Sequence, residues 1–165
     1  LLVFKALSYL KSKKNFSPIL VLTGKLSNQD DSFFDEIIHN IKKFDLDEQV
    51  FLLGFIPKED QFHLMRKSLA VIQPSLFEGW STIVEEARSI GKNIILSDLD
   101  VHKEQNFKHS IFFKKNSYED LAKKILYSYK KFESGPDLKI EQISAIENKK
   151  LMRKFAKQFI LLSNF

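Results

Sequence analysis

The chain has 165 residues, of which 44% are hydrophobic and 16 are Phe, and this composition is typical of one globular domain and excludes a disordered chain. It contains no cysteine and no run near eighteen apolar residues, which excludes disulfides, a thiolate metal site and a transmembrane helix, and is compatible with a reducing cytoplasm. The net charge of +5 is spread evenly along the chain, so we interpret it as a solvated basic surface and expect no nucleic-acid partner.

The amino-terminal residues are predicted to form a helix from the start of the chain. Val3, Ala6, Leu7 and Leu10 recur at the spacing of one helical face. No cationic segment precedes them, so we do not interpret the stretch as a signal peptide. Because the chain begins with Leu and with a helix that has no lead-in, we expect a fragment of a longer protein.

Apolar segments of strand length alternate with amphipathic helices along the rest of the chain. We predict strands at residues 18–24, 49–55, 69–75, 93–98 and 110–113. Helices are predicted after caps at residues 30–32, from Pro57 to about Ser68, from about residue 81, from Ser117, and over about 140–165. Ser117 and Asp120 resemble a capping box, and the helix that they start should bury Leu121 and Ile125. Residues 133–142 are expected to be a connection.

This alternation predicts an α/β fold with a Rossmann-like parallel sheet, flanked by helices on both faces. The strand at 49–55 is nearly continuous in apolar residues and is expected to be buried on both faces. In such sheets, ligands bind outside the carboxyl ends of the strands. The segment PSLFEGWSTIVEEARSIGK, residues 74–92, begins at one of those ends.

Three glutamates in this segment are separated by helical geometry. If a helix begins near Ser81 or Thr82, a stripe of Ile83, Ala87 and Ile90 is buried. Glu85 then points into solvent, Glu86 lies on the flank of the stripe near the loop mouth, and Glu78 lies in the loop itself. Glu78 and Glu86 are therefore the pair that we expect to line one pocket.

The chemistry of this segment suits a sugar nucleotide. Carboxylates accept hydrogen bonds from vicinal hydroxyls, as when an acidic residue holds a ribose. Free N–H groups at the helix start, with the positive end of the helix dipole, suit a diphosphate. The alternative interpretation, in which Glu78 belongs to a turn and Glu86 only complements the helix dipole, stays open on these grounds.

The same residues resemble the donor-site signature of retaining glycosyltransferases of family 4, which have the GT-B architecture. The matching positions are Pro74, Ser75, Glu78, Gly79, Trp80, Glu86, Ala87, Gly91 and Ser97. The resemblance extends to residues 24–31, 50–68 and 101–105, and it spans most of the chain to about residue 130. It implies that the 165 residues form a nucleotide-sugar-binding carboxyl-terminal domain, whose first strand and amino-terminal acceptor domain are absent.

The resemblance also implies roles for individual residues. Glu78, the candidate catalytic residue, would contact hydroxyls of the donor sugar, and Glu86 would hold the ribose hydroxyls. The loop at Phe55 and Ile56 would lie along the nucleobase. The diphosphate would meet the start of the helix, at Gly79, Trp80, Ser81 and Thr82. Ser81 replaces the usual second glycine of the signature, so the backbone there approaches a phosphate less freely, although the hydroxyl could cap the helix or donate to phosphate.

Four residues at the same edge of the predicted sheet have two interpretations each. Lys25 could approach phosphate or be a solvated loop lysine. Trp80 could be a wall for the sugar, although we favour a core anchor. His102 and Glu104 could shape the donor pocket or stabilise their own loop.

The function implied is transfer of a hexosyl unit, with retention, from a nucleotide diphosphate sugar to a glycan or lipid acceptor in polysaccharide or envelope-glycan synthesis. We expect no cofactor and no metal, and a cytoplasmic location in which the full-length protein could associate with the inner membrane surface. The family's Arg and Lys, which stabilise the departing diphosphate, lie outside the chain, so the fragment alone should be inactive. A nucleotide-sugar epimerase and a non-catalytic nucleotide-binding module are the alternatives.

Overall fold

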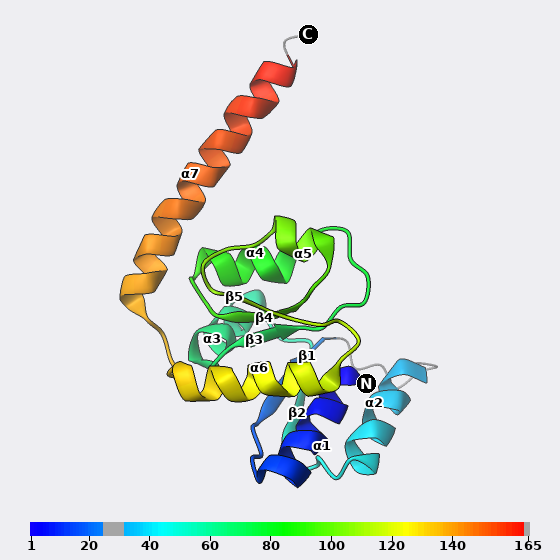
Figure 1. The fold of residues 1–165 in the computed structure, drawn as a ribbon. Helices are drawn as coiled ribbons and strands as arrows, with labels where there is room; N and C mark the ends of the chain where they lie inside the picture. The colour runs from blue at the N-terminus through cyan, green and yellow to red at the C-terminus, as the bar shows by residue number, and fades with distance from the viewer. Residues whose placement is uncertain (25–31, 164–165) are drawn as a thin grey trace.

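The computed structural model describes residues 1–24 and 32–163, in which helices and parallel strands alternate as the sequence predicts (Figure 1). The elements are α1 (Leu2–Lys14), β1 (Leu20–Thr23), α2 (Ser32–Lys43), β2 (Val50–Gly54), α3 (Lys58–Lys67), β3 (Val71–Gln73), α4 (Thr82–Ser89), β4 (Ile94–Ser97), α5 (Asp100–Glu104), β5 (Ser110–Phe113), α6 (Tyr118–Lys131) and α7 (Leu138–Ser163). The α/β fold class is therefore confirmed, and α5 is a short helix that the sequence reading did not predict. The expected caps Asp30 and Asp31 and the candidate Lys25 lie outside the described residues.

The strands form two parallel sheets rather than the single sheet that we expected. β1 pairs with β2, beginning at Leu20 opposite Val50. β4 lies between β3 and β5, with Ile94 opposite both Val71 and Ser110. Within the described residues, no strand pairing joins β1 to β3, so each of these two strands has a partner on one side only.

Helix α1 connects the two sheets by packing. Ala6 and Leu10 join a cluster with residues of β4, β5 and α6, against which Ile72 of β3 also packs. Phe4 and Leu7 join a second cluster that includes Val50 and the partly buried residues of β1. Burial of these apolar side chains is the main favourable term in folding, and the helix predicted at the start of the chain therefore provides the shared core.

Two expectations about burial and boundaries are corrected. Phe51 and Leu53 of β2 are 48% and 46% exposed, because the described helices cover one face of the β1–β2 sheet and the alternate side chains point away from them. The last helix begins at Leu138, so the connection after α6 is shorter than predicted, and Asp137 Oδ1 accepts a hydrogen bond from Ile140 N at 2.9 Å.

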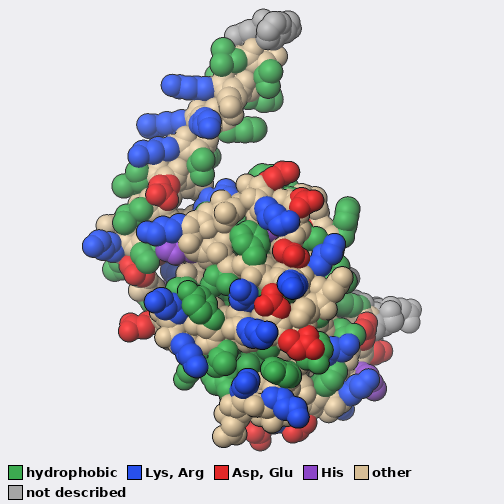
Figure 2. Space-filling view, viewed as in Figure 1, with side chains coloured by type: hydrophobic (Ala, Val, Ile, Leu, Met, Phe, Trp, Pro, Cys, Tyr) green, Lys and Arg blue, Asp and Glu red, His purple; other side chains and the backbone are tan. Residues whose placement is uncertain are grey.

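Helix α7 extends away from the rest of the molecule (Figure 1). Its first turns are held against α4 and α3: Ser144 is buried, and Glu141 pairs with Arg66 at 2.5 Å. From Lys149 to Leu162 every side chain is exposed, and apolar and basic side chains alternate along the projecting part (Figure 2). No described helix is long and apolar enough to cross a membrane.

Candidate functional site

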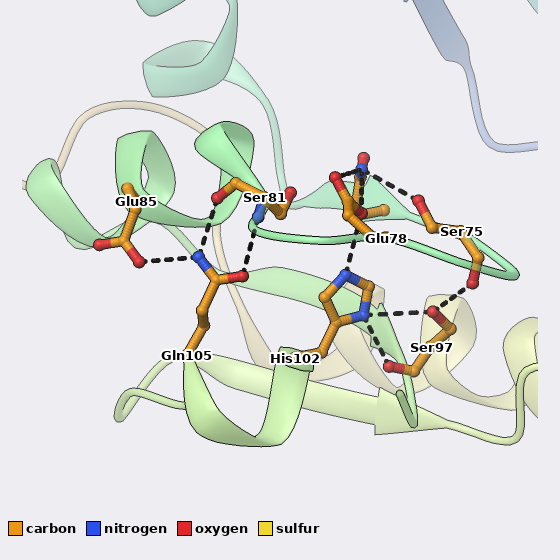
Figure 3. A network of polar contacts seen from close by, with 8 residues as sticks. Ser75, Glu78, Ser81, Glu85, Ser97, His102 and Gln105 are labelled. Atoms are coloured by element: carbon orange, nitrogen blue, oxygen red, sulfur yellow. Dashed lines mark hydrogen bonds and ion pairs between the residues drawn. The ribbon is translucent and has the colours of Figure 1, made fainter. Parts of the chain in front are cut away.

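The loop between β3 and α4 begins at the carboxyl end of β3 and holds Glu78 (Figure 3). The Glu78 side chain is 20% exposed. Gln73, the last residue of β3, donates from Nε2 to Glu78 Oε2 at 3.0 Å. His102 Nε2, from α5, lies 3.2 Å from the same oxygen. The carboxylate is therefore fixed by one side chain from the end of a strand and by another from a helix.

The charge of Glu78 is stabilised by these contacts. Burial by itself would raise the pKa of the Glu78 carboxyl, but hydrogen bonds from the side chains of Gln73, Ser75, His102 and Ser81 outweigh it and hold that pKa below its ordinary value. Glu78 is thus an ionised acceptor at neutral pH. An acceptor of this kind suits ligand hydroxyls.

The start of α4 is held by Gln105, which is fully buried. Gln105 Oε1 accepts from Ser81 N at 3.0 Å, and its Nε2 donates to Ser81 O at 2.9 Å (Figure 3). Ser81 is itself 0% exposed, and its hydroxyl does not cap the helix. The possibility that Ser81 caps α4 is therefore corrected.

The backbone at this turn does not require glycine at position 81. Ser81 has a φ of −85°, in the extended region that any residue adopts. At Gly79, by contrast, an added Cβ would meet no atom within 4 Å, and Thr82 is exposed. The open approach to this turn is therefore over Gly79 and Thr82, on either side of the buried Ser81.

The helical wheel predicted that Glu85 points into free solvent, and the structure corrects this prediction. Its Oε1 accepts from Gln105 Nε2 at 2.8 Å, and its Oε2 pairs with Arg88 at 2.6 Å. The reason is the segment around α5, which lies against this side of α4 and was not predicted. The buried stripe is correspondingly centred on Val84 and Ala87, both 0% exposed, whereas Ile83 is only partly buried.

Glu86 is paired with Lys58, from the first turn of α3. Its side chain is 17% exposed, and Lys58 Nζ also lies 3.1 Å from Gln61 Oε1. Lys58 follows Phe55 and Ile56 at the carboxyl end of β2, so the ion pair brings that loop to α4. The structure thus places the loop that we assigned to the nucleobase next to Glu86, which we assigned to the ribose.

Exposed aromatic side chains lie on the loops that follow β2 and β3. Phe55 is 88% exposed and Ile56 is partly buried. Trp80 is 58% exposed, which corrects the preference for a core anchor, and Phe77 beside Glu78 is 92% exposed. Large apolar side chains that remain uncovered at the end of a sheet are candidates for ligand contact.

The sequence reading missed three residues that shape the site: Lys58, Gln73 and Gln105. Gln73 and Lys58 each sit next to the carboxyl end of a predicted strand, which is a signal that could have found them. Gln105 carried no such signal, because its role depends on the unpredicted helix α5. His102 was noticed from its position, and its contact with Glu78 is now defined.

The profile of the family named glycosyl transferases group 1 matches residues 1–157. The chain belongs to this family. No match is found among curated proteins. The family resemblance that residues 74–97 carry is thereby confirmed at the level of group 1 glycosyltransferases.

Solved structures similar to this glycosyltransferase domain share its fold. HepE of Anabaena in complex with UDP has a TM-score of 0.70 at 16% identity, covering 95% of this chain and 44% of that one. A glycosyltransferase of Rickettsia africae also scores 0.70, at 20% identity, covering 99% and 41%. The catalytic domain of cholesterol-alpha-glucosyltransferase from Helicobacter pylori scores 0.62 at 17% identity, covering 93% and 88%.

At these identities the likeness concerns the fold alone, which is that of a domain of GT-B glycosyltransferases. The domain spans less than half the length of the Anabaena and Rickettsia chains.

Proposed function

We propose that this glycosyltransferase domain binds a nucleotide diphosphate sugar, for retaining transfer of a hexosyl unit to a glycan or lipid acceptor. The observation that carries the proposal is the fixed Glu78 carboxylate at the carboxyl end of β3, with Glu86 held against the loop that follows β2. These are two separate acceptors for hydroxyls at one edge of an α/β fold, where such folds bind ligands.

Each part of the donor has a region that suits it. Glu86 would accept hydrogen bonds from the ribose, and the exposed Phe55 with Ile56 would cover the base, since the Lys58–Glu86 pair holds those regions together. Glu78 would accept from hydroxyls of the sugar and is our candidate for the catalytic carboxylate. The diphosphate would meet α4 at Gly79, Trp80 and Thr82, because the N–H of Ser81 already bonds Gln105.

The preferred base is uracil, on the ground that the structurally similar HepE of Anabaena was solved with UDP and with UDP-glucose. Ribose binding would require Lys58 to leave Glu86. Its flexible side chain would remain close to the ligand, where an ammonium group could face a phosphate.

We further propose that a parallel strand from the amino-terminal side fills the space between β1 and β3 in the full-length protein. In the described residues, β1 and β3 each have hydrogen bonds along one edge only. Leu20 N at β1 donates to Gln49 O beside β2 at 2.7 Å, and Val71 N of β3 donates to Asn93 O beside β4 at 2.9 Å. Helix α1 packs on both sheets, as a helix covering a continuous sheet would. The acceptor site would then lie in a second domain, beyond that strand.

The test is titration calorimetry of the 165-residue chain with UDP, ADP and GDP. We expect UDP to bind best, and Glu86→Gln to weaken its binding roughly tenfold, because a hydrogen bond to a charged group is lost. Glu85→Gln is the matched control, since Glu85 is held by Arg88 and Gln105, and it should change the affinity less than about twofold.

Failure of all three nucleotides to bind would contradict donor binding. Equal effects of the two glutamine variants would contradict the role of Glu86. Binding of UDP without hydrolysis or transfer of UDP-glucose by the full-length protein would favour a non-catalytic nucleotide-binding module.

A further inference from the structure

His102 lies at the centre of the network that holds Glu78, and it is fully buried. Its Nδ1 is 2.8 Å from the backbone oxygen of Ser97 and 3.2 Å from Ser97 Oγ. Ser97 Oγ donates its own proton to Ser75 O at 2.6 Å, so both Ser97 atoms face the ring with lone pairs. Because neither atom can donate to the ring, Nδ1 carries a proton.

The second ring nitrogen, Nε2, faces Glu78 Oε2 at 3.2 Å (Figure 3). In a neutral imidazole whose Nδ1 is protonated, Nε2 has a lone pair, and an ionised carboxylate offers only lone pairs. Two acceptors at this distance repel each other, and the repulsion is stronger where one side chain is fully buried. The contact is attractive only if a proton lies between the two atoms.

We propose that His102 is a positioning residue that shares one proton with Glu78, through Nε2 and Oε2, and thereby orients the Glu78 carboxylate toward the hydroxyls of the donor sugar. The role toward the sugar rests on the proposed function, whereas the shared proton does not. Because the two groups are in direct contact, loss of the shared proton would replace a hydrogen bond with a repulsion. The Glu78 carboxylate would then lose this orientation.

The other groups around the pair do not supply this proton. Gln73 donates to Glu78 as a neutral amide, and the atoms of Ser97 are acceptors toward His102. The charged groups on the flanking elements have partners of their own. Glu85 is bound by Arg88 and Gln105, Asp98 accepts from the backbone N–H of Lys115, and Asp100 pairs with Lys103. We therefore assign the proton between Nε2 and Oε2 to the His102–Glu78 pair itself.

The direct test is nitrogen NMR of the histidine rings in the ligand-free 165-residue chain at pH 7.5, with the carboxyl carbon of Glu78 observed in parallel. We expect both ring nitrogens of His102 to be protonated and Glu78 to be ionised. His109 is an internal control, because burial, with Lys108 nearby, lowers its pKa, so its ring should be neutral. A lone pair on Nε2 of His102 together with an ionised Glu78 would overturn the proposal.

Two variants test the consequence for the donor. In His102→Gln the amide nitrogen can take the place of Nε2 and donate to Glu78, whereas the shorter His102→Asn can donate only near Ser97. The readout is the ratio of the dissociation constants for UDP and UDP-glucose at pH 7.5. In His102→Asn the advantage of UDP-glucose over UDP should be about tenfold smaller than in the unmodified chain, as expected when a charge-assisted hydrogen bond is lost.

His102→Gln should keep the advantage of the unmodified chain to within about twofold. A His102→Gln variant that loses the advantage as fully as His102→Asn would contradict the proposal, as would an unmodified chain that binds both ligands equally. Failure to bind UDP at all would contradict the proposed function instead, and it would leave the NMR result on the shared proton standing. The NMR measurement needs no variant, so a folding defect cannot obscure it.

Discussion

The three glutamates between Pro74 and Gly91 differ in the partners that hold them. Glu78 is bound by Gln73 and His102, Glu85 by Gln105 and Arg88, and Glu86 by Lys58. Only Lys58 is a flexible cation on the surface, with 57% of its side chain exposed. Glu86 is therefore the carboxylate that a ligand can take over at least cost, while Glu78 is the one whose geometry is set in advance.

We predict that Glu78 contributes stability that disappears in acid. Its pKa is lowered in the folded state, so the contribution is present above the ordinary carboxyl pKa of about 4.3 and is lost as the pH falls through the lowered value. At pH 6 the Glu78→Gln variant should be less stable by about 1 kcal/mol, and the difference should shrink toward pH 3.

Urea unfolding at several pH values measures this difference. Asp100→Asn is a suitable control, because the Asp100 side chain is 95% exposed and its loss should shift stability by less than about 0.5 kcal/mol. A difference between Glu78→Gln and the unmodified chain that grows as the pH falls would contradict the assignment.

Residue patterns in the sequence selected Glu78 and Glu86 as candidates but did not show the surroundings of Glu85. The helical wheel placed Glu85 in solvent, because it had no means of showing that the segment around α5 lies against that side of α4. Trp80 was misjudged for a related reason. A large apolar residue in a loop is normally buried when the fold supplies a cover, and the described residues supply none over this loop.

Among the elements, the junction of α4 with α7 depends on one glycine. Gly91 has a φ of +64°, and a Cβ at this position would collide with the side chain of Ile140 and lie 2.5 Å from Ser144 Oγ and 3.2 Å from Ile140 O. Beside it, Lys92 Nζ donates to Arg66 O at 3.0 Å and to Gly135 O at 3.3 Å. The first turns of α7 are thus fitted closely to the end of α4.

We predict that Gly91→Ala destabilises the domain by about 2 to 4 kcal/mol, from the left-handed backbone and the collision together. Hydrogen exchange of residues 138–146 should accelerate, because α7 must move. Gly135→Ala is the control: Gly135 has a φ of +111°, but no atom lies within 4 Å of its added Cβ. It should lower stability through the backbone, without faster exchange in α7. Equal exchange in α7 for both variants would show that the contact with Ile140 is unimportant.

At the scale of the whole molecule, the contacts between α7 and α3 or α4 in the described residues lie in its first turns. The Arg66–Glu141 pair, in which Arg66 Nε and Glu141 Oε1 are 2.9 Å apart, is the last ion pair along this helix in the described residues. The side chains of residues 149–162 are exposed, including Phe155 and Phe159. This part of the helix therefore adds little to the core.

We predict that removing residues 149–165 changes the free energy of unfolding by less than about 0.5 kcal/mol, as expected for segments that bury little surface. Urea unfolding of the shortened chain measures the change. Removal of residues 138–165 is the matched comparison and should be costly, because it uncovers Gly91 and removes Glu141, the partner of Arg66. A large loss from the shorter deletion would mean that the distal helix packs against the domain.

Apart from the short helix α5, the order of helices and strands was accessible from hydrophobic periodicity. Separation of the strands into two sheets was not, since pairing depends on which edges meet in space. The exposed face of β2 follows from that arrangement. Phe51 and Leu53 have the apolar character of a strand buried on both faces, but the described helices cover only one face of the β1–β2 sheet.

The position of α1 between the two sheets has a consequence for cooperativity. In the described residues the two sheets are joined by side-chain packing on Phe4 and Leu7 to one side and on Ala6 and Leu10 to the other, with no ladder of backbone hydrogen bonds across. Opening of the β1–β2 side would break that packing and leave the β3–β4–β5 ladder intact. The domain thus contains two regions that can open with different free energies, and Glu78 and His102 both belong to the three-stranded one.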